Sequence, residues 1–347
     1  MRRPIYLPEL KIEILSRLGK VRLSRFEGKP AIEAYEILMP LFEEHCQDDK
    51  QKILTETFWY AKSLFTERKL EKARSVLESI CPQVAHTEFE GNAIALLART
   101  YLMQDKILMG VETLKGIPPE IRSPSIEFAR GQALRDTKEY ESAIKVLQLS
   151  LEDFGTADRA MASECLVLCG QCYAKLGQAE EGFRLMKEAI AANSDVYGKN
   201  HLYTYSCRGR LYESYLRFER YAEALEGFVS IQAELEATSA GASIRKLIPM
   251  CRIRVLACLA GLERYQEIWQ ELEVRPVDGN QLLDRERFEL ASILAIALTK
   301  TGRQSEVEHF IETRNRLNAA VPSDNLAWID TRERVMQLLR VSGVRLD

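Results

Sequence analysis

Two stretches of the chain carry one pattern: residues 170–189, GQCYAKLGQAEEGFRLMKEA, and residues 212–231, YESYLRFERYAEALEGFVSI. Six positions correspond at a shift of 42 residues: Gly170 and Tyr212, Tyr173 and Tyr215, Gly177 and Glu219, Gly182 and Ala224, Met186 and Phe228, Ala189 and Ile231. Small or turn-forming residues stand where two helices would touch, and larger apolar residues stand between them. The pattern predicts a helical hairpin that occurs twice in succession.

The same pattern extends outward in both directions. The small or aliphatic residue that marks the second helix recurs every 33 to 44 residues, at Ala34, Ala73, Gly110, Ala143, Gly182, Ala224, Ile268 and Val307. Four residues later, on the same helix face, stand Leu38, Leu77, Leu114, Leu147, Met186, Phe228, Leu272 and Ile311. This series predicts about eight hairpins in an all-α chain, because nothing in it has the alternation of a strand pair.

The predicted units form one domain over residues 1–347. Their ranges are 7–47, 53–82, 91–119, 124–154, 162–194, 204–237, 248–275 and 287–318. The first opens with a helix that carries Leu10, Ile14, Leu18 and Val21 at helical spacing.

A last helix, at residues 323–341, is expected to cap the array, with Ser323 or Asp324 as its N-cap. Its expected apolar stripe is Ile329, Met336 and Leu339. The charged residues expected on its other side are Arg332, Glu333, Arg334 and Arg340.

Composition excludes several classes of protein. Hydrophobic residues make up 46% of the chain and charged residues 29%, and the net charge of −3 gives no bulk attraction for nucleic acid. The apolar run at residues 290–298 is far shorter than the roughly 20 residues of a membrane span, and the N-terminus has no signal-peptide core. We expect a cytoplasmic protein, with the nucleus as the alternative, and no membrane partner.

Few residues suggest catalytic or metal chemistry. Cys165, Cys169 and Cys172 lie near one helix face, but Cys165, Cys207 and Cys251 share one phase of successive repeats, which indicates packing rather than zinc ligation. The histidines stand in different units or loops, at His45, His86, His201 and His309. We therefore predict no catalytic residues, no metal and no cofactor.

The hairpin pattern resembles the tetratricopeptide repeat, a family whose hairpins stack into a right-handed α-solenoid. In the loop at residues 197–204, Gly198, His201 and Thr204 match the Gly-x-x-His-Pro-x-Thr of kinesin-light-chain-like arrays, and Leu202 replaces the proline. Residues 98–151 are also similar to tetratricopeptide subunits of the anaphase-promoting complex.

The resemblance implies a partner-binding groove lined by the first helix of each unit. The corresponding positions here are Phe58, Lys62, Phe65, Arg99, Phe128, Gln132, Arg135, Gln171, Lys175, Glu213 and Arg217. The cations would pair with carboxylates of an acidic partner segment, and the three phenylalanines would supply apolar contacts.

We therefore expect a non-catalytic scaffold or adaptor that binds a protein or peptide partner. The alternatives are a structural subunit of a large assembly, which apolar patches on the convex side or at the ends would mark, and the regulatory module of a larger sensor protein. Binding of single-stranded nucleic acid would need stacking residues along the whole groove, whereas these aromatics are confined to units two to four.

Overall fold

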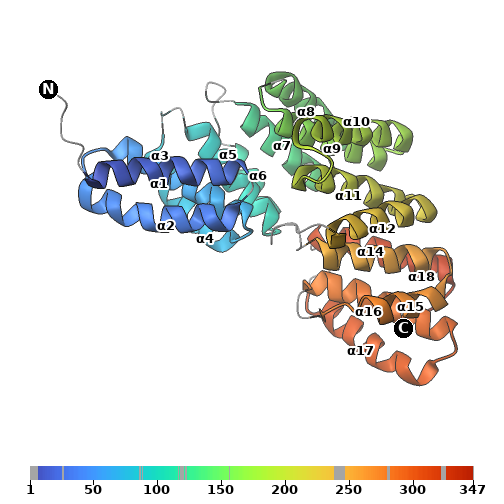
Figure 1. The fold of residues 1–347 in the computed structure, drawn as a ribbon. Helices are drawn as coiled ribbons and strands as arrows, with labels where there is room; N and C mark the ends of the chain where they lie inside the picture. Colours follow the sequence, from blue (N-terminus) through green and yellow to red (C-terminus); the bar gives the residue numbers. More distant parts are fainter. Residues whose placement is uncertain are drawn as a thin grey trace. The chain divides into compact units, whose positions relative to one another are not determined.

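The computed structural model describes residues 7–25, 27–85, 87, 89–115, 117, 121, 123–155, 157–237, 247–279, 282–321 and 326–346. Within these ranges every regular element is a helix, as the repeat pattern predicts. The chain divides into two compact units, Met1–Gly155 and Thr156–Asp347, and each is described by itself (Figure 1).

The described residues of the first compact unit form four helical hairpins. Its helices are α1 (Leu7–Ser24), α2 (Gly28–His45), α3 (Lys50–Thr66), α4 (Leu70–Ile80), a short 3₁₀ turn η1 (Cys81–Gln83), α5 (Glu90–Met103), α6 (Ile107–Lys115), α7 (Pro124–Asp136) and α8 (Tyr140–Phe154). Side chains fix two of the helix starts, because Asp49 accepts a hydrogen bond from the backbone of Lys52 and Ser123 from that of Ile126.

The described residues of the second compact unit form four further hairpins and a last helix. Its helices are α9 (Arg159–Lys175), α10 (Ala179–Tyr197), α11 (Leu202–Arg217), α12 (Tyr221–Ala237), α14 (Ile248–Gly261), α15 (Tyr265–Val274), α16 (Asp284–Lys300), α17 (Gln304–Ala319) and α18 (Leu326–Ser342). The predicted cap residues Ser323 and Asp324 lie outside the described residues.

The repeat phase assigned from the sequence is confirmed by burial. All eight marker residues of the second helices are buried, from Ala34 in α2 to Val307 in α17. Their partners four residues later are buried in the first six hairpins and partly buried in the last two, at Leu272 and Ile311. The period in the sequence therefore records contacts between the two helices of each hairpin.

The hairpin that contains residues 170–189 shows why small residues are needed at these contacts. A Cβ atom at Gly182 in α10 would lie 2.4 Å from the backbone oxygen of Gly170 in α9. Two backbones approach this closely only where neither residue has a side chain.

The turns within the hairpins share one backbone geometry. Seven of them place a single residue at positive φ: Arg68, Asp105, Lys138, Gly177, Glu219, Glu263 and Gly302. Lys138 stands at the repeat position that Gly177 occupies in the fifth hairpin, and it adopts a φ of 68° and so preserves the turn. The turn tolerates a side chain here at some cost in backbone energy.

The last helix presents a different face from the one the sequence suggests. Met336 is 56% exposed, whereas Arg334, expected on the solvent side, is buried together with Trp328 and Val335. The prediction is therefore wrong for Met336 and Arg334, whereas Leu339 of the same stripe is buried as expected. The reason is a buried ion-pair network, described below, that brings Arg334 inward.

Candidate functional site

The predicted groove residues of the first compact unit belong largely to its core. Phe128 is completely buried and Phe58 is 6% exposed. Contrary to expectation, these two rings therefore do not offer an apolar surface to a partner. Phe58 packs edge-on against Trp59, with ring centroids 5.7 Å apart. Of the three phenylalanines, Phe65 is the one that is not buried; it is half-buried.

The cations of the first unit already have neighbours within that unit. The Arg99 guanidinium lies between two rings, 5.2 Å from the centroid of Phe65 and 5.0 Å from that of Phe128. Lys62 Nζ lies 4.8 Å from the Trp59 ring. Each arrangement is a cation–π contact that stabilises the charge where it stands.

Arg135 and Gln132 project from α7, the next first helix along the chain. Arg135 Nε donates to Asp136 Oδ1 at 2.8 Å, so the neighbouring carboxylate offsets its charge. Gln132 is half-buried. The positive stripe read from the sequence is therefore weaker in the first unit than a count of its cations suggests.

In the second compact unit, the predicted cations converge on carboxylates of the chain's own last helix. Lys175 Nζ, at the end of α9, lies 3.2 Å from Asp330 Oδ1 and 3.1 Å from Glu333 Oε2. The Arg217 guanidinium, at the end of α11, lies 3.2 Å from Asp330 Oδ2, and the Arg217 carbonyl accepts a 3.2 Å hydrogen bond from Gln337 Nε2. Gln171 lies one turn before Lys175 on α9, and it is half-buried.

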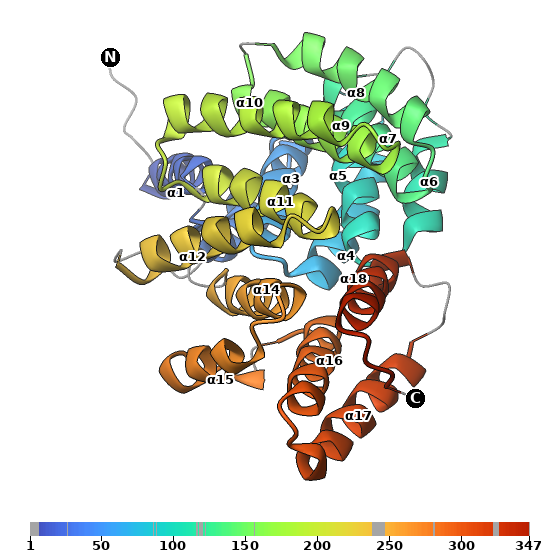
Figure 2. The ribbon, with the colours of Figure 1, turned by 90° about the vertical axis from the view of Figure 1, so that its right-hand side faces the viewer.

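A buried network anchors α18 beside these contacts. Glu289 of α16 is 1% exposed and lies 2.6 Å from Arg254 of α14 and 3.0 Å from Arg334 of α18. Arg254 also lies 3.0 Å from Glu213, the predicted groove residue of α11. Helices α11, α14, α16 and α18 thus contribute one charged side chain each to this network. Figure 2 shows α18 beside α16.

The network holds its carboxylates in the charged form. Burial alone would raise the pKa of Glu289, but Arg254 and Arg334 outweigh it and lower that pKa to about 2. The pKa of Glu213 is also lowered, because Arg254 and Arg334 oppose the effect of burial. For Asp330, Arg217 and Lys175 oppose burial and lower the pKa in the same way.

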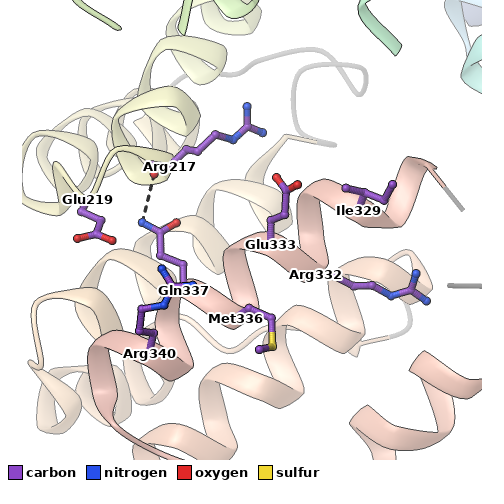
Figure 3. Close-up of a pocket in the computed structure, with 8 residues that line it drawn as sticks. All are labelled: Arg217, Glu219, Ile329, Arg332, Glu333, Met336, Gln337 and Arg340. Carbon is purple, nitrogen blue, oxygen red and sulfur yellow. Dashed lines mark hydrogen bonds between the residues drawn. The ribbon is translucent and has the colours of Figure 1, made fainter. Parts of the chain in front are cut away.

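An open pocket of about 480 Å³ lies between the end of α11 and the outward face of α18. Its lining combines three arginines and two glutamates with apolar and amide groups: Arg217, Arg332, Arg340, Glu219, Glu333, Ile329, Met336 and Gln337 (Figure 3). Arg217 thus belongs both to the predicted groove and to this pocket.

The arginines of the pocket are held to different degrees. Arg332 donates to Asn318 Oδ1 at 2.9 Å and to the Val321 carbonyl at 3.0 Å. Arg340 is exposed and forms no ion pair within the described part of the chain. The pocket can therefore offer a carboxylate one exposed guanidinium, with the apolar Met336 side chain beside it.

The loop matched to kinesin-light-chain-like arrays has a structural role. His201 precedes α11, and its Nδ1 accepts a hydrogen bond from the Tyr203 backbone at 3.3 Å. Its ring stacks on Tyr197 with centroids 4.8 Å apart, and Thr204 Oγ1 donates to the Gly198 carbonyl at 2.8 Å. Burial lowers the pKa of His201, which favours the neutral ring that this cap requires.

The cysteines pack as small apolar residues, as their repeat phase predicts. Cys165, Cys169 and Cys172 are buried in α9, and burial raises the pKa of Cys169 to about 12. In the described ranges no group of three His, Cys, Asp or Glu residues is arranged to hold a metal ion. His86 lies outside the described residues.

Comparison with solved structures places the fold among tetratricopeptide-repeat proteins. A Rap protein complexed with competence and sporulation factor is 10% identical over 96% of this chain and 98% of that chain, with a TM-score of 0.62. NprR in complex with its cognate peptide NprX is 15% identical over 84% and 83%, with a TM-score of 0.54.

A third similar structure is a signal transduction ATPase with a tetratricopeptide repeat sensor from Pyrococcus horikoshii. It is 14% identical over 96% of this chain and 55% of that chain, with a TM-score of 0.52. No protein-family model and no curated protein sequence matches the chain. At these identities the likeness defines a tetratricopeptide-like helical repeat fold, as the residue pattern predicts.

None of the described helices combines the length and the apolar character that crossing a bilayer requires.

The sequence does not reveal the importance of the buried charges Arg254 and Glu289. Their signal is a charged residue inside an apolar run, as in residues 251–260 and 288–298, but such a run does not reveal the partner that neutralises it.

Proposed function

We propose that the chain is a peptide-binding module whose second compact unit takes a partner segment with acidic residues. The observation that carries this proposal is that Lys175 and Arg217, from successive first helices, hold carboxylates spaced three residues apart on a helix, Asp330 and Glu333. The chain's own α18 thus supplies the kind of carboxylates that these cations would accept from a partner.

The place for a partner segment is the pocket on the outward face of α18. Arg217 reaches this pocket from α11, and Arg340 is exposed at its edge. A partner carboxylate would pair with Arg340, and an aliphatic side chain would contact Met336, which is 56% exposed. The role is binding, and the proposal includes no reaction.

The similar structures support a peptide as the class of partner. One of them holds competence and sporulation factor and another holds the cognate peptide NprX. The structure from Pyrococcus horikoshii contains a repeat sensor, which agrees with a regulatory module as a second form of the same function.

The proposal is tested by selecting peptides on the immobilised full chain and measuring their affinity by fluorescence anisotropy. We expect the selected peptides to be rich in Asp and Glu and to bind more weakly as salt rises, because screened rim pairs lose their attraction. Arg340→Glu should lower affinity about tenfold. Lys187→Glu, the same charge change on the exposed face of α10, is the matched control.

Three outcomes would contradict the proposal. Peptides without acidic residues, or binding that Arg340→Glu leaves unchanged, would exclude the pocket on α18 as the site. Equal losses in Arg340→Glu and Lys187→Glu would indicate a general effect of net charge instead of a contact.

A further inference from the structure

Helix α1 exposes a continuous apolar stripe. Leu10, Ile14, Leu18 and Val21 are 42%, 55%, 37% and 47% exposed. At 100° per residue these four positions fall within an arc of about 80°, so their side chains form one line along the helix. Exposed apolar residues that gather in this way mark an interaction surface more often than scattered ones do.

The stripe is not a core face that has turned outward. The opposite side of α1 is the one that packs, through Ile12 and Leu23, which are buried. Ser16 Oγ donates to Glu56 Oε1 at 2.8 Å, and a Cβ atom at Gly19 would lie 2.7 Å from the Tyr35 ring. Because these contacts fix the rotation of α1, its second apolar face remains on the surface of the first compact unit.

The charges beside the stripe are predominantly basic. Lys11 and Arg22 border it and form no ion pair within the described part of the chain. Arg17 also borders it and pairs with Glu13 at 2.6 Å, but both side chains are more than half exposed, so the pair contributes little. A matching surface therefore needs an apolar line with acidic borders.

We propose that α1 docks an amphipathic helix of a partner protein whose apolar stripe is flanked by Asp or Glu. Leu10, Ile14 and Leu18 are spaced four residues apart and form a ridge that fits the groove between side-chain rows of another helix. The flanking cations then pair with the acidic borders and set the orientation. This surface is independent of the pocket on α18.

The charge pattern argues against a second copy of the chain. Two α1 helices packed by their stripes would bring the basic borders together, and like charges across an interface oppose association. The stripe also contains no aromatic residue of the kind that membrane-surface helices place at the lipid boundary.

The test is selection from a displayed library of 18-residue helices with leucine at i, i+3, i+4 and i+7 and random residues at the bordering positions. On the full chain we expect the bordering positions to become rich in Asp and Glu. A selected peptide, measured by fluorescence anisotropy, should bind the Ile14→Asp variant at least tenfold more weakly than the parent chain. It should bind the double variant Lys11→Glu/Arg22→Glu even more weakly than Ile14→Asp. Ile37→Asp, at a 52% exposed position on α2, is the control.

Further measurements separate this surface from its alternatives. The melting temperature of Ile14→Asp should equal that of the parent chain, because Ile14 is exposed, and pocket-directed peptides should bind it normally. A library without acidic enrichment, or peptides that bind Ile14→Asp as well as the parent, would refute the proposal. A dimer in sedimentation, or binding to anionic vesicles, that Ile14→Asp abolishes would replace the partner helix with a second copy or a membrane.

Discussion

Replacing Glu289 with glutamine should detach α18 from the second compact unit more readily than any exposed substitution. Glu289 is the carboxylate between Arg254 and Arg334, with oxygen to nitrogen distances of 2.6 and 3.0 Å. The amide keeps the shape of the side chain and removes its charge. Buried Arg334 then loses the carboxylate it pairs with, and buried Arg254 keeps only Glu213, and leaving a buried charge uncompensated in this way is strongly destabilising.

The expected magnitude follows from the pKa of Glu289. Its value falls from the ordinary 4.5 to about 2, and a difference of this size corresponds to about 3 kcal/mol of unfolding free energy. The folded-state pKa is the depressed one, so this stability is present above pH 4.5 and is lost as the pH falls toward 2. Between pH 5 and 7, Glu289→Gln should cost about 3 kcal/mol, and the difference from the parent should shrink below pH 4.

Trp328 provides the local measurement, because this α18 side chain is 6% exposed and packs on Phe288 with ring centroids 5.6 Å apart. In a Trp59→Phe/Trp269→Phe background, its fluorescence during urea titration reports the unfolding of this region. Glu312→Gln, an exposed position on α17, is the control. A loss below about 1 kcal/mol, or one equal to that of the control, would refute the account of the network.

Three other predictions concern the helix contacts, a hairpin turn and the buried cysteines. Ala143→Leu and Ala224→Leu, both at fully buried positions, should each cost about 1–3 kcal/mol in thermal or urea unfolding through overpacking, whereas Glu141→Leu on the exposed face of α8 should cost little. Lys138→Gly should raise the unfolding free energy by roughly 0.5–1 kcal/mol, because glycine adopts the positive φ of this turn without strain; a destabilised variant would contradict this. Elemental analysis should find no stoichiometric zinc, and thiol titration of the native chain should leave buried Cys169 unreacted until denaturant is added.

The fold could be predicted from the sequence because the two helices of each hairpin bury their apolar faces against each other and against the neighbouring hairpins. Such contacts are local, and they recur at a period that the sequence displays directly. The contact of Gly170 with Gly182 spans only one turn, and the positive φ of Lys138 repeats that of Gly177. Burial of the markers from Ala34 to Val307 follows from the same regularity.

The site was less predictable because its contacts join positions far apart in the chain. Lys175 meets Asp330 and Glu333 across more than 150 residues, and no repeat period relates these positions. The family pattern correctly marks first-helix positions, but it does not tell which of them point into the core, as Phe128 does. Burial depends on how neighbouring hairpins pack, and that varies from one unit to the next.

The anchoring of α18 also decides what the groove cations of the second unit can do. The buried ion pair of Arg334 with Glu289 holds α18 against α16, so Asp330 and Glu333 of α18 lie at fixed positions opposite Lys175 and Arg217. These two cations are therefore compensated before any partner arrives, and a new carboxylate would have to displace one that is already held. Under the proposed function, recognition of an acidic partner would depend on the groups that α18 presents outward, where Arg340 is exposed. Helix α18 thus supplies carboxylates to Lys175 and Arg217 and leaves Arg340 on its exposed face.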